Sequence, residues 1–221
     1  MRIEPSTLEF LADLAVNNNR DWFLANKKRF EAAQDNVTAF AGNMIGEIGK
    51  FDDAVATLDP RSCVFRIYRD VRFSKDKSPY KTNLSIYISP GGRKSMLPGY
   101  YFHVQPGHSF IAGGKHVPAG PELLKIRTTI ADNSLEFLEI VNRKSFVERF
   151  GELRGDRLKS FPKGFDQGNK ASEYLKLKEF MAYLEIADDR AVASDDFPKK
   201  LVKIIKEMFP LVAFLRRALG I

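Results

Sequence analysis

Apolar residues recur every seven positions near the start of the chain, a spacing typical of one buried face of a helix. The stripe consists of Phe23, Phe30, Val37, Met44 and Phe51. It predicts a helix of about 30 residues that begins near Asn19 and lies on its own domain. A coiled-coil dimer is the alternative. We favour the first interpretation because the stripe does not repeat Leu and Ile as coiled coils do.

The middle of the chain changes to a period of two, which is typical of strands. Four segments rich in β-branched and aromatic residues predict strands: 63–68, 84–89, 100–105 and 109–112. Pro106 and Gly107 predict a tight turn between the last two, which then form a hairpin. No segment between neighbouring strands could form a helical crossover, so the sheet is expected to be mostly antiparallel. Phe30 and Val37 should be buried against it.

Alternation sorts the strand side chains into two faces. The apolar face, which the long helix should cover, comprises Phe65, Ile67, Ile86, Ile88, Phe102, Val104, Phe110 and Ala112. The other face comprises Arg66, Tyr68, Ser85, Tyr87, Tyr101, His103, Gln105 and Ser109. A solvated sheet face is common in antiparallel sheets. This face is polar and aromatic rather than rich in Lys and Glu, so we favour a ligand-binding surface.

From Pro118 onward the period is helical again, with helices expected at 121–130, 134–141, 146–150, 172–183 and 197–219. Pro210 should kink or divide the last of these. The predicted fold class is therefore α+β. A mostly antiparallel sheet (about residues 61–113) is packed by a long N-terminal helix, and the C-terminal half is helical. We expect a single domain over 1–221, with N-terminal helices at 6–50, the sheet and a basic loop at 61–113, and a helical part at 119–220.

Composition narrows the class of protein. The chain has 221 residues, of which 44% are hydrophobic and 29% charged, as in ordinary globular proteins. No apolar run approaches the roughly 20 residues that span a bilayer, so we expect no membrane partner. The single cysteine, Cys63, excludes an internal disulfide and a cysteine-built zinc site. We therefore expect a cytoplasmic protein, and its oligomeric state stays open.

The positive charge is concentrated in one stretch. Nine Lys and Arg residues and two Asp residues lie between Arg61 and Lys94, and this stretch accounts for the whole formal net charge of +7. A local positive field of this kind favours an anionic partner.

Much of this charge lies in a loop of fifteen residues, Arg69 to Asn83, which joins the first two predicted strands. Loops of this length in compact domains are often functional. Arginines offer paired donors for phosphate or carboxylate, and lysines add mobile charge. A solvated loop with local ion pairs is the alternative, but the density of cations favours an anion site. The candidate ligand-binding residues are Arg66, Tyr68, Arg69, Arg72, Lys75, Lys77, Tyr80, Lys81, Asn83 and Tyr87.

The main functional hypothesis is therefore a protein that binds a phosphorylated or other anionic small molecule between the basic 66–83 loop and the polar sheet face. A nucleic-acid-binding module is the second choice, in which tyrosines of that face stack on bases. A metal-independent enzyme acting on phosphate esters is the third. In it His103 is the acid or base, and Tyr101 and Asp70 are candidates for a second proton-transfer group.

Other chemistry is disfavoured. The Gly-Gly pairs at 91–92 and 113–114 lack the spacing of a phosphate-binding P-loop. The three histidines, His103, His108 and His116, are irregularly spaced and lack an acidic or cysteine cluster, so we expect no metal and no cofactor. Cys63 lies in the register of the apolar face, as an inert core thiol would.

Several stretches together resemble a known family. They are NNNRDWF at 17–23, the loop motif with RFSKDKSPYKTN at 72–83, Gly113-Gly114, Ile126-Arg127, FPKGF at 161–165 and YLKLK at 174–178. They resemble the domain-of-unknown-function family numbered 2461, which is widespread in bacteria. The resemblance covers nearly the whole chain and implies one unit centred on the basic loop. It implies no particular activity, cofactor or catalytic residue.

Overall fold

The structure is a computed structural model that describes all 221 residues. It contains ten α-helices and a four-stranded antiparallel sheet, which confirms the α+β class and the helical C-terminal half. Its contacts divide the chain into two compact units. Unit 1 comprises Met1–Ser95, Tyr101–Ile111 and Glu185–Lys203, and unit 2 comprises Met96–Tyr100, Ala112–Leu184 and Ile204–Ile221. The single domain expected from the sequence stays a prediction.

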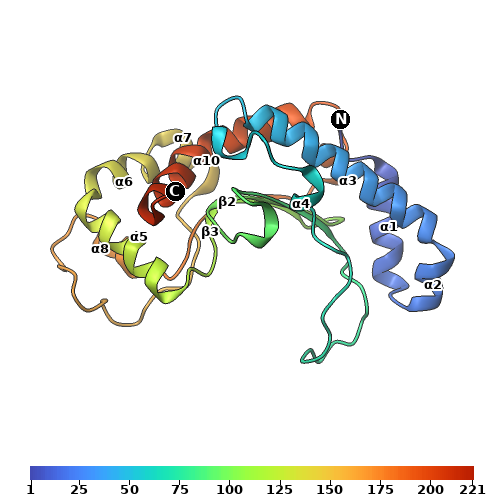
Figure 1. Ribbon diagram of the computed structural model, residues 1–221, viewed down its shortest axis with the longest axis horizontal. Coiled ribbons are helices and arrows are strands. Elements are labelled where there is room, and N and C mark those ends of the chain that lie inside the picture. Colours follow the sequence, from blue (N-terminus) through green and yellow to red (C-terminus); the bar gives the residue numbers. More distant parts are fainter. The chain divides into compact units, whose positions relative to one another are not determined.

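The long N-terminal helix exists, but it is shorter than expected. Unit 1 begins with α1 (Pro5–Val16), α2 (Arg20–Ala25) and α3 (Lys27–Ile48) (Figure 1). The break falls at Asn26, whose side-chain Nδ2 donates to the carbonyl oxygen of Trp22 at 2.9 Å. Short amides compete with the helical backbone in this way, which explains why the seven-residue stripe does not form one continuous helix.

Phe30 and Val37 are buried as predicted, but Phe30 packs against other helices rather than against the sheet, and Phe51 at the end of the stripe is only half-buried. Phe30 is 8% exposed and Val37 is fully buried. The Phe30 ring lies against Phe23 (ring centroids 5.0 Å apart) and Phe10 (6.1 Å), which belong to α2 and α1. Contact with the sheet comes from Phe40, whose centroid is 5.7 Å from that of Phe102. One end of α3 thus closes an aromatic cluster, and its middle covers the sheet.

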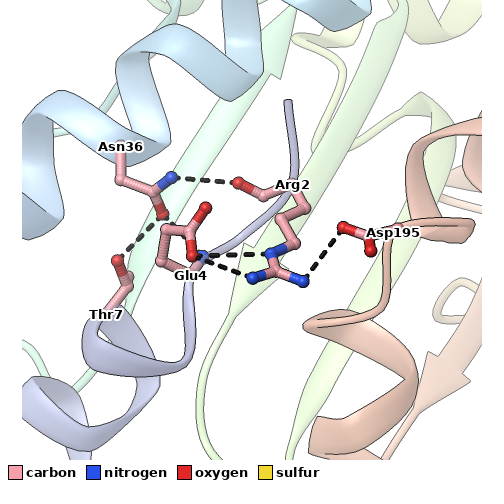
Figure 2. A network of polar contacts seen from close by, with 5 residues as sticks. All are labelled: Arg2, Glu4, Thr7, Asn36 and Asp195. Carbon is pink, nitrogen blue, oxygen red and sulfur yellow. Dashed lines mark hydrogen bonds and ion pairs between the residues drawn. The ribbon is translucent and has the colours of Figure 1, made fainter.

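A polar network fixes the start of α1 on α3 (Figure 2). The Asn36 side-chain oxygen accepts from the Glu4 backbone N–H and from Thr7 Oγ1, both at 2.9 Å, and its Nδ2 donates to the Arg2 carbonyl at 2.9 Å. Arg2 also pairs with Asp195 at 2.9 Å. One amide of α3 therefore satisfies three polar groups where the chain enters α1, and it partly replaces a local cap.

The sheet has the strand order β1-β2-β3-β4, with β1 Leu84–Ile88, β2 Gly99–Val104, β3 Ser109–Lys115 and β4 Phe180–Ile186. The predicted hairpin between β2 and β3 is confirmed. Its turn places Gly107 at φ 70°, and the His108 N–H donates to the Gln105 carbonyl at 3.0 Å. A positive φ of this size favours glycine.

One strand assignment and one helix assignment from the sequence are wrong. Residues 60–63 form the short helix α4 (Pro60–Cys63), and residues 64–68 pair only through isolated antiparallel bridges at Val64 and Tyr68. The fourth strand comes from the segment 172–183 that was expected to be helical. There α8 (Ser172–Leu175) is a single turn, and β4 follows. Gly114 makes this pairing possible, because a Cβ at this position would lie 2.0 Å from the Phe180 carbonyl oxygen.

The register of β3 also differs from the prediction. The Phe110 ring stacks on His103 with centroids 4.6 Å apart and contacts Tyr101 at 5.6 Å. Phe110 therefore lies on the polar face, and buried Ser109 does not. The tight turn sets His103 opposite Phe110, and a one-residue change of register moves every side chain of a strand to the other face. Phe65 is likewise on this face, with its ring 6.1 Å from Tyr101.

The remaining helices are short except the last. Unit 2 contains α5 (Gly120–Asp132), α6 (Ser134–Val141), α7 (Lys144–Phe150) and α8, whereas α9 (Asp189–Val192) belongs to unit 1. Helix α10 runs from Phe197 to Leu219 with Pro210 inside it, so Pro210 does not divide this helix as expected. None of the helices combines the length and apolar character that crossing a membrane requires.

Candidate anion-binding site

The basic loop is the far end of a long two-armed hairpin in unit 1. Its arms are joined by backbone hydrogen bonds from Phe65 to Ser85 (2.9 Å), from Lys81 to Ile67 (2.8 Å) and from Arg69 to Pro79 (3.0 Å). In Figure 1 this is the teal segment that leaves α4, turns back and returns to β1. We call residues 66–83 the basic hairpin. Only isolated bridges and these single hydrogen bonds join the arms, so no continuous strand forms where the sequence predicts the first strand of the sheet.

The basic hairpin is fixed to the connection between α1 and α2. The Asn18 side chain donates from Nδ2 to the Tyr80 carbonyl at 3.0 Å and accepts from the Tyr80 N–H at 3.1 Å. The Tyr80 ring stacks on Phe23 with centroids 3.9 Å apart and an angle of 12° between the rings. The 17–23 and 72–83 stretches thus meet through Asn18 and Tyr80, which are 62 residues apart in the sequence.

A cleft of about 370 Å³ opens beside this anchor. Most of its lining is polar and comes from the returning arm of the basic hairpin. The lining residues are Ala15, Asn18, Arg69, Asp76, Ser78, Tyr80, Lys81, Thr82 and Asn83. Of the predicted ligand-binding residues, the cleft brings together Arg69, Tyr80, Lys81 and Asn83.

Ion pairs within the basic hairpin neutralise some of its cations. Arg69 pairs with Asp76, and Arg72 pairs with Asp70 through two contacts of 3.0 and 2.6 Å. Hydrogen bonds from Arg69, and then from Ser78, hold the pKa of Asp76 well below its usual range. Lys77 donates to the Val71 carbonyl at 2.9 Å. These contacts stabilise the conformation of the outer part of the hairpin. The Asp70 carboxylate is occupied by its ion pair with Arg72.

Two cations at the root of the basic hairpin have no acidic partner. Neither Arg66 nor Lys81 forms an ion pair, and the Lys81 Nζ lies 5.5 Å from the centre of the Phe65 ring. Burial, and then the positive charge of Arg66, lower the pKa of Lys81 below its usual value. Arg66 does not line the cleft, but its positive charge disfavours the charged form of Lys81, which does, and an anion bound to Lys81 would offset that effect.

A polar cluster on the sheet adjoins the cleft through Asn83. Ser85 Oγ donates to the Asn83 side-chain oxygen at 2.9 Å and accepts from the Tyr101 hydroxyl at 2.9 Å. His103 lies between Tyr101 (Nδ1 to Oη, 3.1 Å) and Gln105 (Nε2 to Oε1, 2.8 Å). The cluster thereby connects the cleft to the polar sheet face through a chain of hydrogen bonds.

The cluster is partly desolvated. Burial lowers the pKa of His103, and nearby Lys81 lowers it further, while the hydrogen bond with Gln105 raises it. Burial also raises the pKa of Tyr101. Both groups are therefore neutral at pH 7. Because both ring nitrogens of His103 face protein groups, it could take a proton from a ligand only after one of these contacts opens.

Other predicted site residues lie apart from the cleft or at its edge. Tyr68 is 50% exposed and its ring is 5.5 Å from that of Tyr80, whereas Lys75 is exposed at the outer end of the basic hairpin. Tyr87 is a half-buried residue of β1. The catalytic roles of His103, Tyr101 and Asp70 stay predictions.

The sequence analysis did not select Asn18, Ser78 or Thr82 as site residues, although all three line the cleft. The run of three asparagines was a usable signal for Asn18, because such side chains bond to neighbouring backbone. No group of three His, Cys, Asp or Glu side chains is placed to hold a metal ion.

These features occur in a chain of a recognised family. The chain belongs to the family described as "Conserved hypothetical protein (DUF2461)", whose sequence model matches residues 6–214. This membership confirms the resemblance seen in the sequence. No curated protein and no solved structure shows significant similarity to the chain.

Proposed function

We propose that this protein binds a phosphorylated or other anionic small molecule in the cleft at the root of the basic hairpin. The observation that carries the proposal is Lys81, a partly buried cation without an acidic partner whose ammonium lies over the Phe65 ring, with the positive charge of Arg66 acting on it. Lys81 also lines the cleft. Cations are almost always paired where they lose solvent, so an unpaired, partly buried ammonium is suited to an exchangeable anion.

The remaining cleft residues complement this charge. Ser78 and Thr82 offer hydroxyl groups, and Asn83 offers an amide whose oxygen is already engaged by Ser85. That contact turns the amide N–H₂ of Asn83 toward other acceptors, such as phosphate oxygens. Asp76 also lines the cleft, but its pairing with Arg69 offsets its charge. The ligand would therefore contact the Lys81 ammonium and the neutral donors of Ser78, Thr82 and Asn83 rather than a free carboxylate.

The proposed location is the cytoplasm, in line with a single buried cysteine and no disulfide. Catalysis is not part of the proposal, because binding requires only the unpaired cations and the cleft.

Calorimetric titration of pyrophosphate, an anion small enough for the cleft, tests the proposal. We expect Lys81→Ala and Arg66→Ala each to weaken binding by about tenfold or more, since hydrogen bonds to charged groups contribute roughly 1.5–3 kcal/mol. Lys28→Ala is the matched control, because Lys28 is an exposed cation of α3 in the same unit. Equal affinities of all three variants and the unaltered protein would reject the proposal.

A further inference from the structure

The outer end of the basic hairpin carries the most exposed aromatic side chain of the molecule. Phe73 is 97% exposed, whereas most other phenylalanines are buried or half-buried. The Arg72 guanidinium carbon lies 5.9 Å from the centre of this ring. A fully exposed ring contributes nothing to the core, so packing does not account for it.

Cations surround this ring. Residues 69–78, which we call the hairpin tip, contain four Lys and Arg residues and two Asp residues. Arg72, Lys75 and Lys77 are all exposed. Tyr68, which directly precedes the tip, is 50% exposed, so exposed rings and cations follow one another along the outgoing arm. The ion pair of Arg72 with Asp70 is solvent-exposed, and such a pair is weak enough to exchange for another anion.

We propose that the hairpin tip is a binding surface for single-stranded nucleic acid. Unpaired bases would stack on Phe73 and Tyr68, and the phosphates would contact Arg72 and Lys75. Alternating rings and cations are the combination that single strands require, whereas the bases of a duplex are stacked on one another and hide their faces. The surface is small, so affinity is modest and sensitive to salt.

An anionic membrane is a poorer partner for the same surface. Membrane-binding segments insert several apolar side chains, and the tip offers only Phe73, beside Val71, which is half-buried. The inference goes beyond the small-anion site, because it depends on Phe73 and Lys75 rather than on Lys81 and the cleft.

Fluorescence anisotropy with labelled 20-nucleotide oligo-dT and oligo-U, at 50 and 200 mM salt, tests it. Phe73→Ala should weaken binding at least fivefold, which corresponds to the loss of about one stacked base. Leu124→Ala, which removes a 57% exposed side chain from α5, is the matched control and should change nothing. Lys75→Ala should make the dependence of log affinity on log salt shallower by about 0.7.

Three results would overturn the inference. One is the absence of oligonucleotide binding at 50 mM salt. Another is unchanged affinity of Phe73→Ala. The third is that Phe73→Ala reduces sedimentation with phosphatidylserine vesicles while oligonucleotide binding is unaffected. Pyrophosphate titration of Phe73→Ala separates this inference from the cleft, because that binding should be unaltered even if the hairpin tip binds no nucleic acid.

Discussion

The side chain of Asn18 pairs with both backbone polar groups of Tyr80, through hydrogen bonds of 3.0 and 3.1 Å. The amide thus satisfies the Tyr80 N–H and carbonyl as a neighbouring strand would, on the side of the hairpin arm where no strand lies. The Tyr80 ring adds a stacking contact with Phe23 at 3.9 Å. The backbone of Tyr80 is fixed from one side and its ring from the other, which holds the adjoining Lys81 in place.

Replacement of Asn18 by Ala should destabilise the protein by about 1–3 kcal/mol, because it leaves the N–H and carbonyl groups of Tyr80 without partners. Urea denaturation measures this loss. Asn18→Asp keeps the acceptor and removes the donor, so its effect should be intermediate. A loss below about 0.5 kcal/mol for Asn18→Ala, the range of ordinary surface substitutions, would show that the anchor is unimportant.

Phe30 and Phe73 provide a matched pair of identical substitutions in unit 1. Phe30 is 8% exposed and lies within the aromatic cluster, whereas Phe73 is 97% exposed. Phe30→Ala should cost about 3–5 kcal/mol through lost burial and the cavity left behind. Phe73→Ala should stay within about 0.5 kcal/mol. Chemical denaturation of both variants tests the two placements, and similar losses would contradict them.

The sequence was sufficient for the fold class and for the core residues of α3, because burial imposes strong periodicity on a helix. Phe30 and Val37 were identified correctly for this reason. It was insufficient for the segment after Leu175, where charged residues at 176, 178 and 179 precede the strand β4. Strand β4 lies at the edge of the sheet and pairs with β3, which is distant in the sequence. Such a pairing leaves no local pattern in the sequence that would indicate a strand.

The candidate site was predictable in part. Charge density alone singled out the basic hairpin, but it did not distinguish paired from unpaired cations. Arg69 and Arg72 have acidic partners, whereas Arg66 does not, and only the path of the hairpin decides which carboxylate each arginine meets. The change of face for Phe110 has a similar cause, since the geometry of the turn sets the register and residue type does not.

Gly114 should be irreplaceable. It lies in β3 at φ 137°, and a Cβ there would come within 2.0 Å of the Phe180 carbonyl oxygen. Gly114→Ala should therefore cost more than about 3 kcal/mol, through backbone strain and loss of pairing with β4.

Gly120→Ala is the control for this prediction, because nothing lies within 4 Å of a Cβ there and its φ is not positive. Thermal and urea denaturation should show little change for Gly120→Ala. Equal stability of the two alanine variants would contradict the close approach of β3 and β4.

Stability should fall at mildly acidic pH because of His103. Burial lowers the pKa of its imidazole below the ordinary value of 6.5, so the unfolded chain binds a proton more readily than the folded protein. Stability then rises with pH across the window between the lowered pKa and 6.5, and is fully present above 6.5. Urea denaturation at pH 5 and pH 7.5 should show this difference, and His103→Gln should reduce it. His108→Gln removes a weaker contribution to the same lowered pKa, from an exposed histidine of the β2–β3 turn, so it should reduce this difference less than His103→Gln does. A His103 ring that titrates by NMR at or above 6.5 would contradict the desolvated polar cluster on which the prediction rests.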